Sequence, residues 1–253
     1  MSKGQTRLTL AALVAKTWDS WDPAAVQTAI TDGQILVDGR LLTNPNARVT
    51  PGAHLRFEPP HDLAGRRKLS WGIERFGIAA TGRVALDVGA STGGFTTAWL
   101  EAGATRVYAV DAGHGQLLGS LRQDSRVVNL ERTNVGQLSA TLVPEPVSLV
   151  SVDVSYLSLA AAVRQLEEGV SWCDDADLLG LVKPMFELRL ATIPDDAPTL
   201  ERARDEAVNG VRSAQWHVMA VEESPIRGGK GAVEFLLHAK RSMRGAKRAQ
   251  QFR

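Results

Sequence analysis

Roughly the first quarter of the chain has the hydrophobic pattern of a small module with two helices and several short strands. Apolar residues at helical spacing predict helices over Leu8–Lys16 and Pro23–Thr31. Asp22 suits the N-cap of the second helix, and a proline suits the first helical position after it. The apolar run Gly33–Val37 leads into an Asp38-Gly39 turn, which is typical of a hairpin. This pattern predicts a small α+β domain.

From Lys68 onward, short apolar runs alternate with stretches of helical spacing. The runs that predict strands are Val84–Val88, Val107–Val110, Val147–Val152 and Leu178–Val182. The stretches that predict helices are Phe95–Ala102, Gln116–Leu121, Leu159–Glu167 and Leu200–Ser213. Fully apolar strands separated by helices are typical of a parallel sheet that is covered on both faces, an α/β fold. Two late strands, His217–Val221 and Val233–Ala239, have no full helix between them, so we expect an antiparallel pair at one edge.

These patterns divide the chain into four segments. We expect the small α+β domain over residues 1–59 and a linker over residues 60–67, because consecutive prolines at 59 and 60 cannot continue a β-ladder. The α/β domain is expected over residues 68–242, and a basic tail over residues 243–253.

The composition is that of an ordinary soluble globular protein, with 44% hydrophobic and 23% charged residues among 253. The single cysteine, Cys173, cannot form an intramolecular disulfide, and no cysteine cluster points to zinc, so we expect no metal. The N-terminus lacks the apolar stretch of a signal peptide, and no window reaches the length of a membrane span. We therefore expect a cytoplasmic protein with no membrane partner.

Charge is balanced over the chain, with a formal net value of +1, so no overall attraction to a polyanion is expected. The C-terminal residues from Lys240 to Arg253 include six basic and no acidic side chains. Such a segment is suited to contacts with nucleic-acid phosphates, although on charge alone a solvated terminus is the favoured interpretation.

A glycine-rich turn follows the strand Val84–Val88 and leads into a helix, where the backbone can approach a ligand closely. The spacing Gly89-x-x-x-Gly93-Gly94 differs from the G-x-G-x-x-G pattern that surrounds a pyrophosphate. Asp87 would repel a pyrophosphate and would suit the ammonium group of a methionine moiety. The turn therefore favours S-adenosylmethionine over a nicotinamide cofactor. The residues expected at this cofactor site are Asp87, Gly89, Ala90, Ser91, Thr92, Gly93, Gly94 and Phe95.

Further charged residues end the neighbouring predicted strands. Asp111 lies where ribose hydroxyls of a nucleoside cofactor would bind, which fits either cofactor. Asp153 ends the third strand and Lys183 follows the fourth, and a charge at such a position requires a partner. We expect Asp153 and Lys183 to be neighbours that serve the reaction, with a purely structural ion pair as the alternative.

Four segments in a fixed order carry a family resemblance: Leu86–Thr96, Leu130–Asn134, Leu181–Glu187 and Ser224–Ile226. They resemble the TlyA family, whose members are often named haemolysins and contain an FtsJ-type ribosomal RNA methyltransferase domain. The N-terminal domain resembles the small RNA-binding domain shared with ribosomal protein S-four and pseudouridine synthases. The matching positions are Gly33, Val37, Asp38-Gly39, Pro45 and Val49.

The resemblance implies a Rossmann-like class I methyltransferase sheet and transfer of a methyl group from S-adenosylmethionine to a ribose 2′-hydroxyl. Ribosomal RNA or a ribosomal subunit is the implied partner, and the oligomeric state stays open. The implied catalytic residues are Lys68, Asp153, Lys183 and Glu234. The second motif adds Thr133 and Asn134 to the implied cofactor contacts, which also include Asp111 and Asp153.

The chain departs from the family pattern in three places. Residues 63–68 replace a Ser-Arg-Gly-Gly-type stretch, and residues 188–196 replace a segment rich in glycine and lysine. The second helix has Ala24–Gln27 where relatives often carry an arginine. These departures leave a second hypothesis open, an RNA-binding or ribosome-assembly protein with a vestigial methyltransferase fold. A membrane-active haemolysin and a small-molecule methyltransferase are weaker alternatives.

Overall fold

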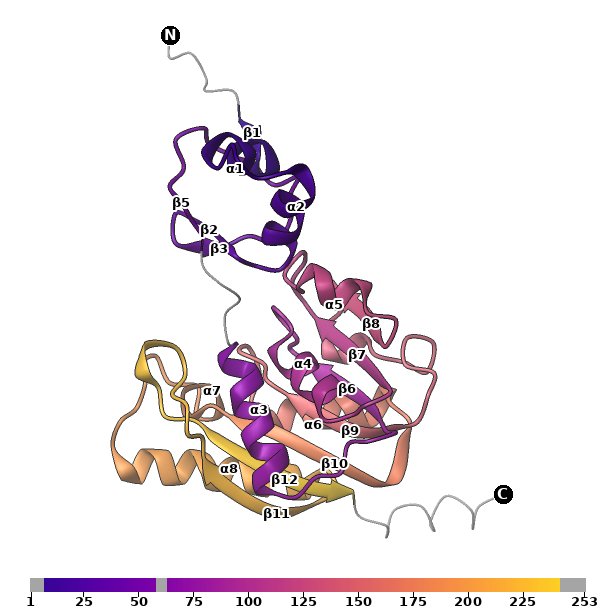
Figure 1. Ribbon diagram of the computed structural model, residues 1–253. Coiled ribbons are helices and arrows are strands. Elements are labelled where there is room, and N and C mark those ends of the chain that lie inside the picture. The colour runs from indigo at the N-terminus through magenta and orange to yellow at the C-terminus, as the bar shows by residue number, and fades with distance from the viewer. Residues whose placement is uncertain (1–6, 58–62, 242–253) are drawn as a thin grey trace.

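The computed structural model describes residues 7–57 and 63–241, and its larger part is built around a seven-stranded sheet (Figure 1). The strands are β6 (Val84–Val88), β7 (Arg106–Asp111), β8 (Val127–Glu131), β9 (Val147–Val152), β10 (Trp172–Val182), β11 (Trp216–Glu223) and β12 (Phe235–Arg241). Their order across the sheet is β11-β12-β10-β9-β6-β7-β8. β12 runs antiparallel to both β10 and β11, and the remaining pairs are parallel. The expected α/β class with an antiparallel edge pair is confirmed.

Helices cover both faces of this sheet. They are α3 (Ala64–Arg75), α4 (Gly94–Glu101), α5 (Gly119–Gln123), α6 (Leu159–Gly169), α7 (Pro184–Glu187) and α8 (Ala197–Ser213), with 3-10 turns η1 (Val135–Gln137) and η2 (Gly229–Gly231). Successive strand side chains point to opposite faces. Ala85 accordingly packs with Leu69 of α3 and Trp99 of α4. Leu86 belongs to the opposite cluster, which includes Val163 of α6 and residues of α8.

The N-terminal module, residues 7–57, has a hydrophobic core of its own. It contains β1 (Leu8–Thr9), α1 (Leu10–Thr17), α2 (Pro23–Thr31), β2 (Ile35–Val37), β3 (Arg40–Leu41), β4 (Arg48–Val49) and β5 (Leu55–Phe57). The side chain of Asp22 caps α2 as expected, accepting the amide of Ala25 at 2.7 Å. The module meets the larger part where α2 contacts α5, and Thr43 donates a hydrogen bond to the carbonyl of Gly115, in the loop before α5, at 2.7 Å. In Figure 1 it lies beyond the β7–β8 edge of the sheet.

Several expected boundaries need correction. Helix α1 begins at Leu10 because Thr9 caps it and Leu8 pairs with β4. Helix α3 begins at Ala64, inside the expected linker, and its Gly65 packs closely against Gly94 and Phe95 of α4. Residues 60–62 of that linker and the tail 243–253 lie outside the described residues. The helix expected over Gln116–Leu121 is α5, which begins at Gly119.

Two strands differ from the expectation by more than two residues. β10 begins at Trp172, six residues before Leu178, because a register shift lets polar residues join its first half. β8 was missed as a strand, since its half-exposed positions include Asn129 and lack a continuous apolar run.

Candidate active site

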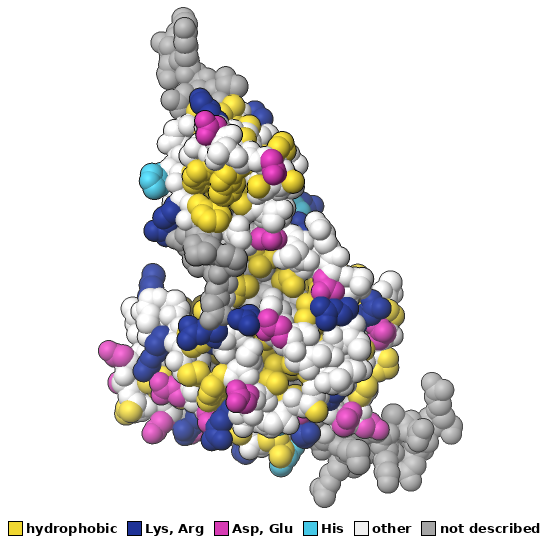
Figure 2. All heavy atoms as spheres, in the orientation of Figure 1, with side chains coloured by type: hydrophobic (Ala, Val, Ile, Leu, Met, Phe, Trp, Pro, Cys, Tyr) yellow, Lys and Arg dark blue, Asp and Glu magenta, His cyan; other side chains and the backbone are white. Residues whose placement is uncertain are grey.

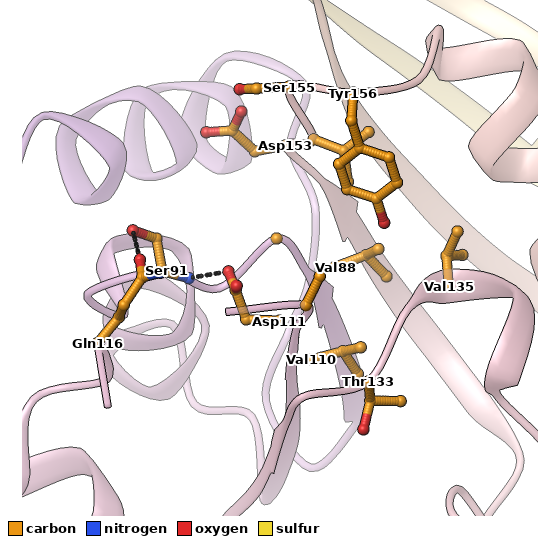
Figure 3. A pocket seen from close by; sticks show the side chains of 13 residues that line it. Val88, Ser91, Val110, Asp111, Gln116, Thr133, Val135, Asp153, Ser155 and Tyr156 are labelled. Atoms are coloured by element: carbon orange, nitrogen blue, oxygen red, sulfur yellow. Dashed lines mark hydrogen bonds between the residues drawn. The ribbon is translucent and has the colours of Figure 1, made fainter. Parts of the chain in front are cut away.

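A cavity of about 240 Å³ opens at the carboxyl ends of β6, β7 and β9 (Figure 3). Its walls include Gly89 and Ser91 after β6, and Asp111 at the end of β7. Thr133 lies on the side of β8, and residues 153–156 after β9 complete the wall. Ligands of open parallel sheets bind at this edge, so the location fits the expected cofactor site.

The turn after β6 is shaped by close packing against the end of β9. Gly89 has φ +90°, and a Cβ there would overlap the carbonyl oxygen of Asp153. Ser91 donates its backbone amide to one oxygen of Asp111 at 2.8 Å, and Gly113 donates to the other at 2.6 Å. The carboxylate of Asp111 therefore joins the turn to the end of β7 and faces the cavity, as Figure 3 shows.

Asp87 faces away from this cavity, contrary to the expected direct contact with a ligand. Alternation along β6 turns Val88 toward the cavity and the carboxylate of Asp87 toward α4, where it is fully buried. Thr96 donates to one carboxylate oxygen at 2.7 Å and Ser151 to the other at 2.9 Å, and Ser151 accepts from Trp99. Burial raises the pKa of Asp87 to about 7, although the hydrogen bonds from Thr96 and Ser151 act in the opposite direction.

The other expected cofactor residues divide into two groups. Those that line the cavity are Gly89, Ser91, Asp111, Thr133 and Asp153. Those that do not line it are Ala90, Thr92, Gly93, Gly94, Phe95 and Asn134. Phe95 packs in the core, and Asn134 caps η1 through a capping box with Gln137. Gly93, at φ +99°, makes room for Leu121, so it supports the turn from behind.

The cavity also includes residues that sequence reasoning had not assigned to the site. Gln116, Val135, Ser155 and Tyr156 are among them. Ser155 and Tyr156 lie two and three residues after Asp153, so their closeness in sequence to it was the available signal. Gln116 lies in a loop without a recognisable motif, and only the hydrogen bond between Ser91 and Gln116 connects it to the turn.

The four expected catalytic residues form two ion pairs. Lys183 pairs with Asp153 and also donates to the hydroxyl of Ser155 at 2.9 Å. Lys68 of α3 pairs with Glu234 at 2.5 Å, and both of these side chains are buried. The expected proximity of Asp153 and Lys183 is therefore confirmed.

A second cavity, of about 220 Å³, brings one member of each pair together. Lys183 and Glu234 line it with Ser155, and most of its remaining wall is apolar. Ser155 also lines the first cavity, so the two spaces adjoin at the residues after β9. The structure therefore has one cavity at the glycine-rich turn and a neighbouring cavity beside Lys183, which is paired with the carboxylate of Asp153.

The FtsJ-like methyltransferase family model matches residues 65–241, which include both cavities. The chain belongs to this methyltransferase family. The expected resemblance to TlyA proteins is also confirmed. The chain is 40% identical to the 16S/23S rRNA (cytidine-2'-O)-methyltransferase TlyA of Mycobacterium tuberculosis over 81% of this chain and 79% of the relative.

Haemolysin-named proteins are also similar to this FtsJ-like methyltransferase. Hemolysin A of Brachyspira hyodysenteriae is 29% identical over 84% of this chain and 91% of its own length. The solved structure of a hemolysin-named protein from Streptococcus thermophilus superposes with a TM-score of 0.68 at 27% identity, covering 94% of this chain and 90% of the other. Within residues 7–57 and 63–241, no helix has both the length and the apolar character needed to cross a membrane.

Proposed function

We propose that this enzyme transfers the methyl group of S-adenosylmethionine to a ribose 2′-hydroxyl of ribosomal RNA. The two adjoining cavities carry the proposal, because methyl transfer requires a cofactor and an acceptor side by side. Asp153 lines the first cavity, and its ion-pair partner Lys183 lines the second. The ribosomal substrate is inferred from the TlyA relative, whose name specifies 2′-O-methylation of cytidine in 16S and 23S rRNA.

The first cavity fits a nucleoside with a charged amino-acid tail. Asp111 presents a carboxylate, a suitable acceptor for the hydroxyls of a ribose. Val88 and Val135 give apolar surface for a base, and Gly89 leaves the backbone open to close approach. Once bound, S-adenosylmethionine supplies a methyl group that is already activated by its sulfonium.

Lys183 is the residue that acts on the acceptor. The Lys183 ammonium is fixed by Asp153 and Ser155, so it can hold the hydroxyl oxygen in one position and stabilise the negative charge that develops on it. The proton of the acceptor hydroxyl passes to solvent as the methyl group is transferred. Glu234 lines the same cavity, and Lys68 holds it in place.

The N-terminal module is the proposed RNA-binding domain, within the boundaries 1–59 expected from the sequence. Figure 2 shows acidic and basic side chains interspersed on the face drawn there, in keeping with the formal net charge of +1. Recognition of RNA on this face would therefore depend on local contacts more than on a long-range electrostatic attraction.

Replacement of Lys183 by alanine tests the mechanism. Purified protein with labelled S-adenosylmethionine is expected to methylate ribosomal subunits or their RNA, and Lys183→Ala should lower the rate by about 100-fold or more. Cofactor binding, measured by calorimetry, should stay within a few-fold of the wild-type value. Arg202→Ala removes an exposed positive charge on α8 and serves as the matched control.

Two results would count against this function. Full activity of Lys183→Ala would refute the role given to that lysine. Cofactor binding without transfer to any ribosomal substrate would instead favour the ribosome-assembly hypothesis.

A further inference from the structure

The carboxylate of Glu187 connects two chain segments beside the proposed reaction site, the segment from Lys183 to Glu187 and the loop over residues 153–158. Glu187 ends α7, which begins directly after Lys183. One of its oxygens accepts the backbone amide of Leu159, the first residue of α6, at 2.6 Å. Glu187 is absent from the walls of both cavities, so it acts through its neighbours and not on a ligand.

This hydrogen bond connects segments that the sheet itself leaves unpaired. The parallel ladder between β9 and β10 ends at Val152 and Gly180. Beyond that point, Lys183 binds Asp153 and Ser155, and Glu187 binds Leu159. The loop over residues 153–158 is therefore attached to the Lys183 segment near both of its ends.

The N-terminus of α6 explains why a carboxylate is used for this attachment. The amide of Leu159 has no partner within its own helix, and the positive end of the helix favours an anion. Ser158 provides a separate cap by accepting the amide of Ala161 at 3.2 Å. The two bonds fix the point where the loop ends and the helix begins.

Opposing effects act on the charge of Glu187. Burial raises its pKa to about 7, the bond from Leu159 lowers it, and the charge of Glu206 on α8 raises it further. Near neutral pH, the strength of the attachment therefore varies with the ionisation of this carboxylate, because a charged acceptor makes the stronger hydrogen bond.

We propose that Glu187 is a positioning residue that holds the loop 153–158 against Lys183, and with it the geometry of Asp153 and Ser155. The kinetic effect that we expect from this role rests on the proposed methyl transfer. The physical attachment does not depend on that activity, so it can be tested separately.

The first test measures the loop without turnover. Amide hydrogen exchange followed by mass spectrometry should show faster exchange over residues 153–160 in Glu187→Ala than in wild type, because the attachment is lost. Glu201→Gln removes an exposed carboxylate on α8 that does not act on Glu187, and should leave this exchange unchanged. Unchanged exchange in Glu187→Ala would overturn the proposal even if the enzyme proved inactive on every RNA.

The second test measures turnover with ribosomal substrate. Glu187→Ala should lower kcat by on the order of 10- to 100-fold, with a cofactor dissociation constant near that of wild type. Glu187→Gln retains an acceptor oxygen and should recover most of the rate. Equal loss in the two variants, or no loss in either, would contradict a positioning role.

The pH profile separates Glu187 from the other titrating groups. Activity of the wild type should include a rise near pH 7 that Glu187→Gln lacks. Glu206→Gln should move that rise to lower pH, since a neighbouring negative charge has been removed. A rise that persists unchanged in Glu187→Gln would assign it to another group and refute this step.

Discussion

Asp87 combines complete burial with hydrogen bonds at both carboxylate oxygens. Burial removes the water that would solvate the carboxylate, and this raises its pKa from 3.8 to about 7. The hydrogen bonds from Thr96 and Ser151 stabilise the charged form, but they offset the loss of water only in part. Asp87 joins the turn after β6 to α4 and β9 from behind the cavity. Its charge therefore affects the stability of the site's framework more directly than it affects a ligand.

Replacing Asp87 by asparagine should flatten the pH dependence of stability. With the higher pKa in the folded state, the folded protein binds more protons than the unfolded chain between about pH 4 and 7. The free energy of unfolding therefore falls as pH rises through that range, by on the order of 4 kcal/mol from this group. Glu187, whose pKa is also raised to about 7, contributes in the same direction and should account for the slope that remains.

Urea unfolding at a series of pH values from 5 to 8 measures this slope for wild type and Asp87→Asn. Asp174→Asn changes an exposed carboxylate and should keep the wild-type slope. A slope in Asp87→Asn equal to that of wild type would show that Asp87 does not titrate differently in the folded protein.

At the scale of elements, the turn between β6 and α4 shapes one wall of the proposed cofactor cavity. Gly89 allows the end of β6 to lie directly against the backbone of Asp153, which in turn donates its amide to Val88 at 2.8 Å. A side chain at residue 89 would separate the two strand ends. The position of Asp153, at the end of β9, therefore depends on the absence of a Cβ at residue 89, after the neighbouring strand β6. Lys183 contacts Asp153 from the other side, after β10.

Gly89→Ala should both destabilise the protein and weaken cofactor binding. Positive φ costs about 1–2 kcal/mol for alanine, and the overlap with Asp153 adds about 1–3 kcal/mol. Gly82→Ala is the matched control, because Gly82 also has positive φ but has open space where a Cβ would lie. Calorimetry should show at least about a tenfold loss of cofactor affinity for Gly89→Ala and little change for Gly82→Ala. Equal losses in the two variants would assign the effect to backbone strain alone.

The same elements show what could be predicted from the sequence. The core strands β6 and β9 were predicted to the residue, because each is a short apolar run with abrupt ends. β8 lacked that signal, since an edge strand can expose Asn129 and still pair. The ion pair between Lys183 and Asp153 followed from the need to neutralise charges at adjacent strand ends. The direction of Asp87 and the inclusion of Gln116 depended on tertiary packing that no local pattern encodes.

At the scale of the whole molecule, the N-terminal module contacts α5 and the loop before it, and this loop borders the proposed cofactor cavity. Thr43 binds the carbonyl of Gly115, and Gln116 next to it lines the cavity. Gly119 of α5 lies against Thr31 at the end of α2, and a Cβ at Gly119 would overlap that side chain. A cavity of about 400 Å³ separates the two parts beside this contact, with Asn44 and His114 among its walls. Close packing at this contact therefore helps to set the position of the module.

Gly119→Ala should disturb this contact, although alanine is favoured over glycine in an isolated helix by up to about 1 kcal/mol. The overlap with Thr31 is expected to cost about 1–3 kcal/mol and to raise KM for ribosomal substrate, because the proposed RNA-binding domain is displaced from the catalytic cavities. Adding Thr31→Gly makes room for the new methyl group and should restore most of the KM. A double-mutant cycle on the free energy of unfolding and on KM measures the coupling. Strictly additive effects of Gly119→Ala and Thr31→Gly would mean that the two residues do not touch in solution, and that this contact does not position the module.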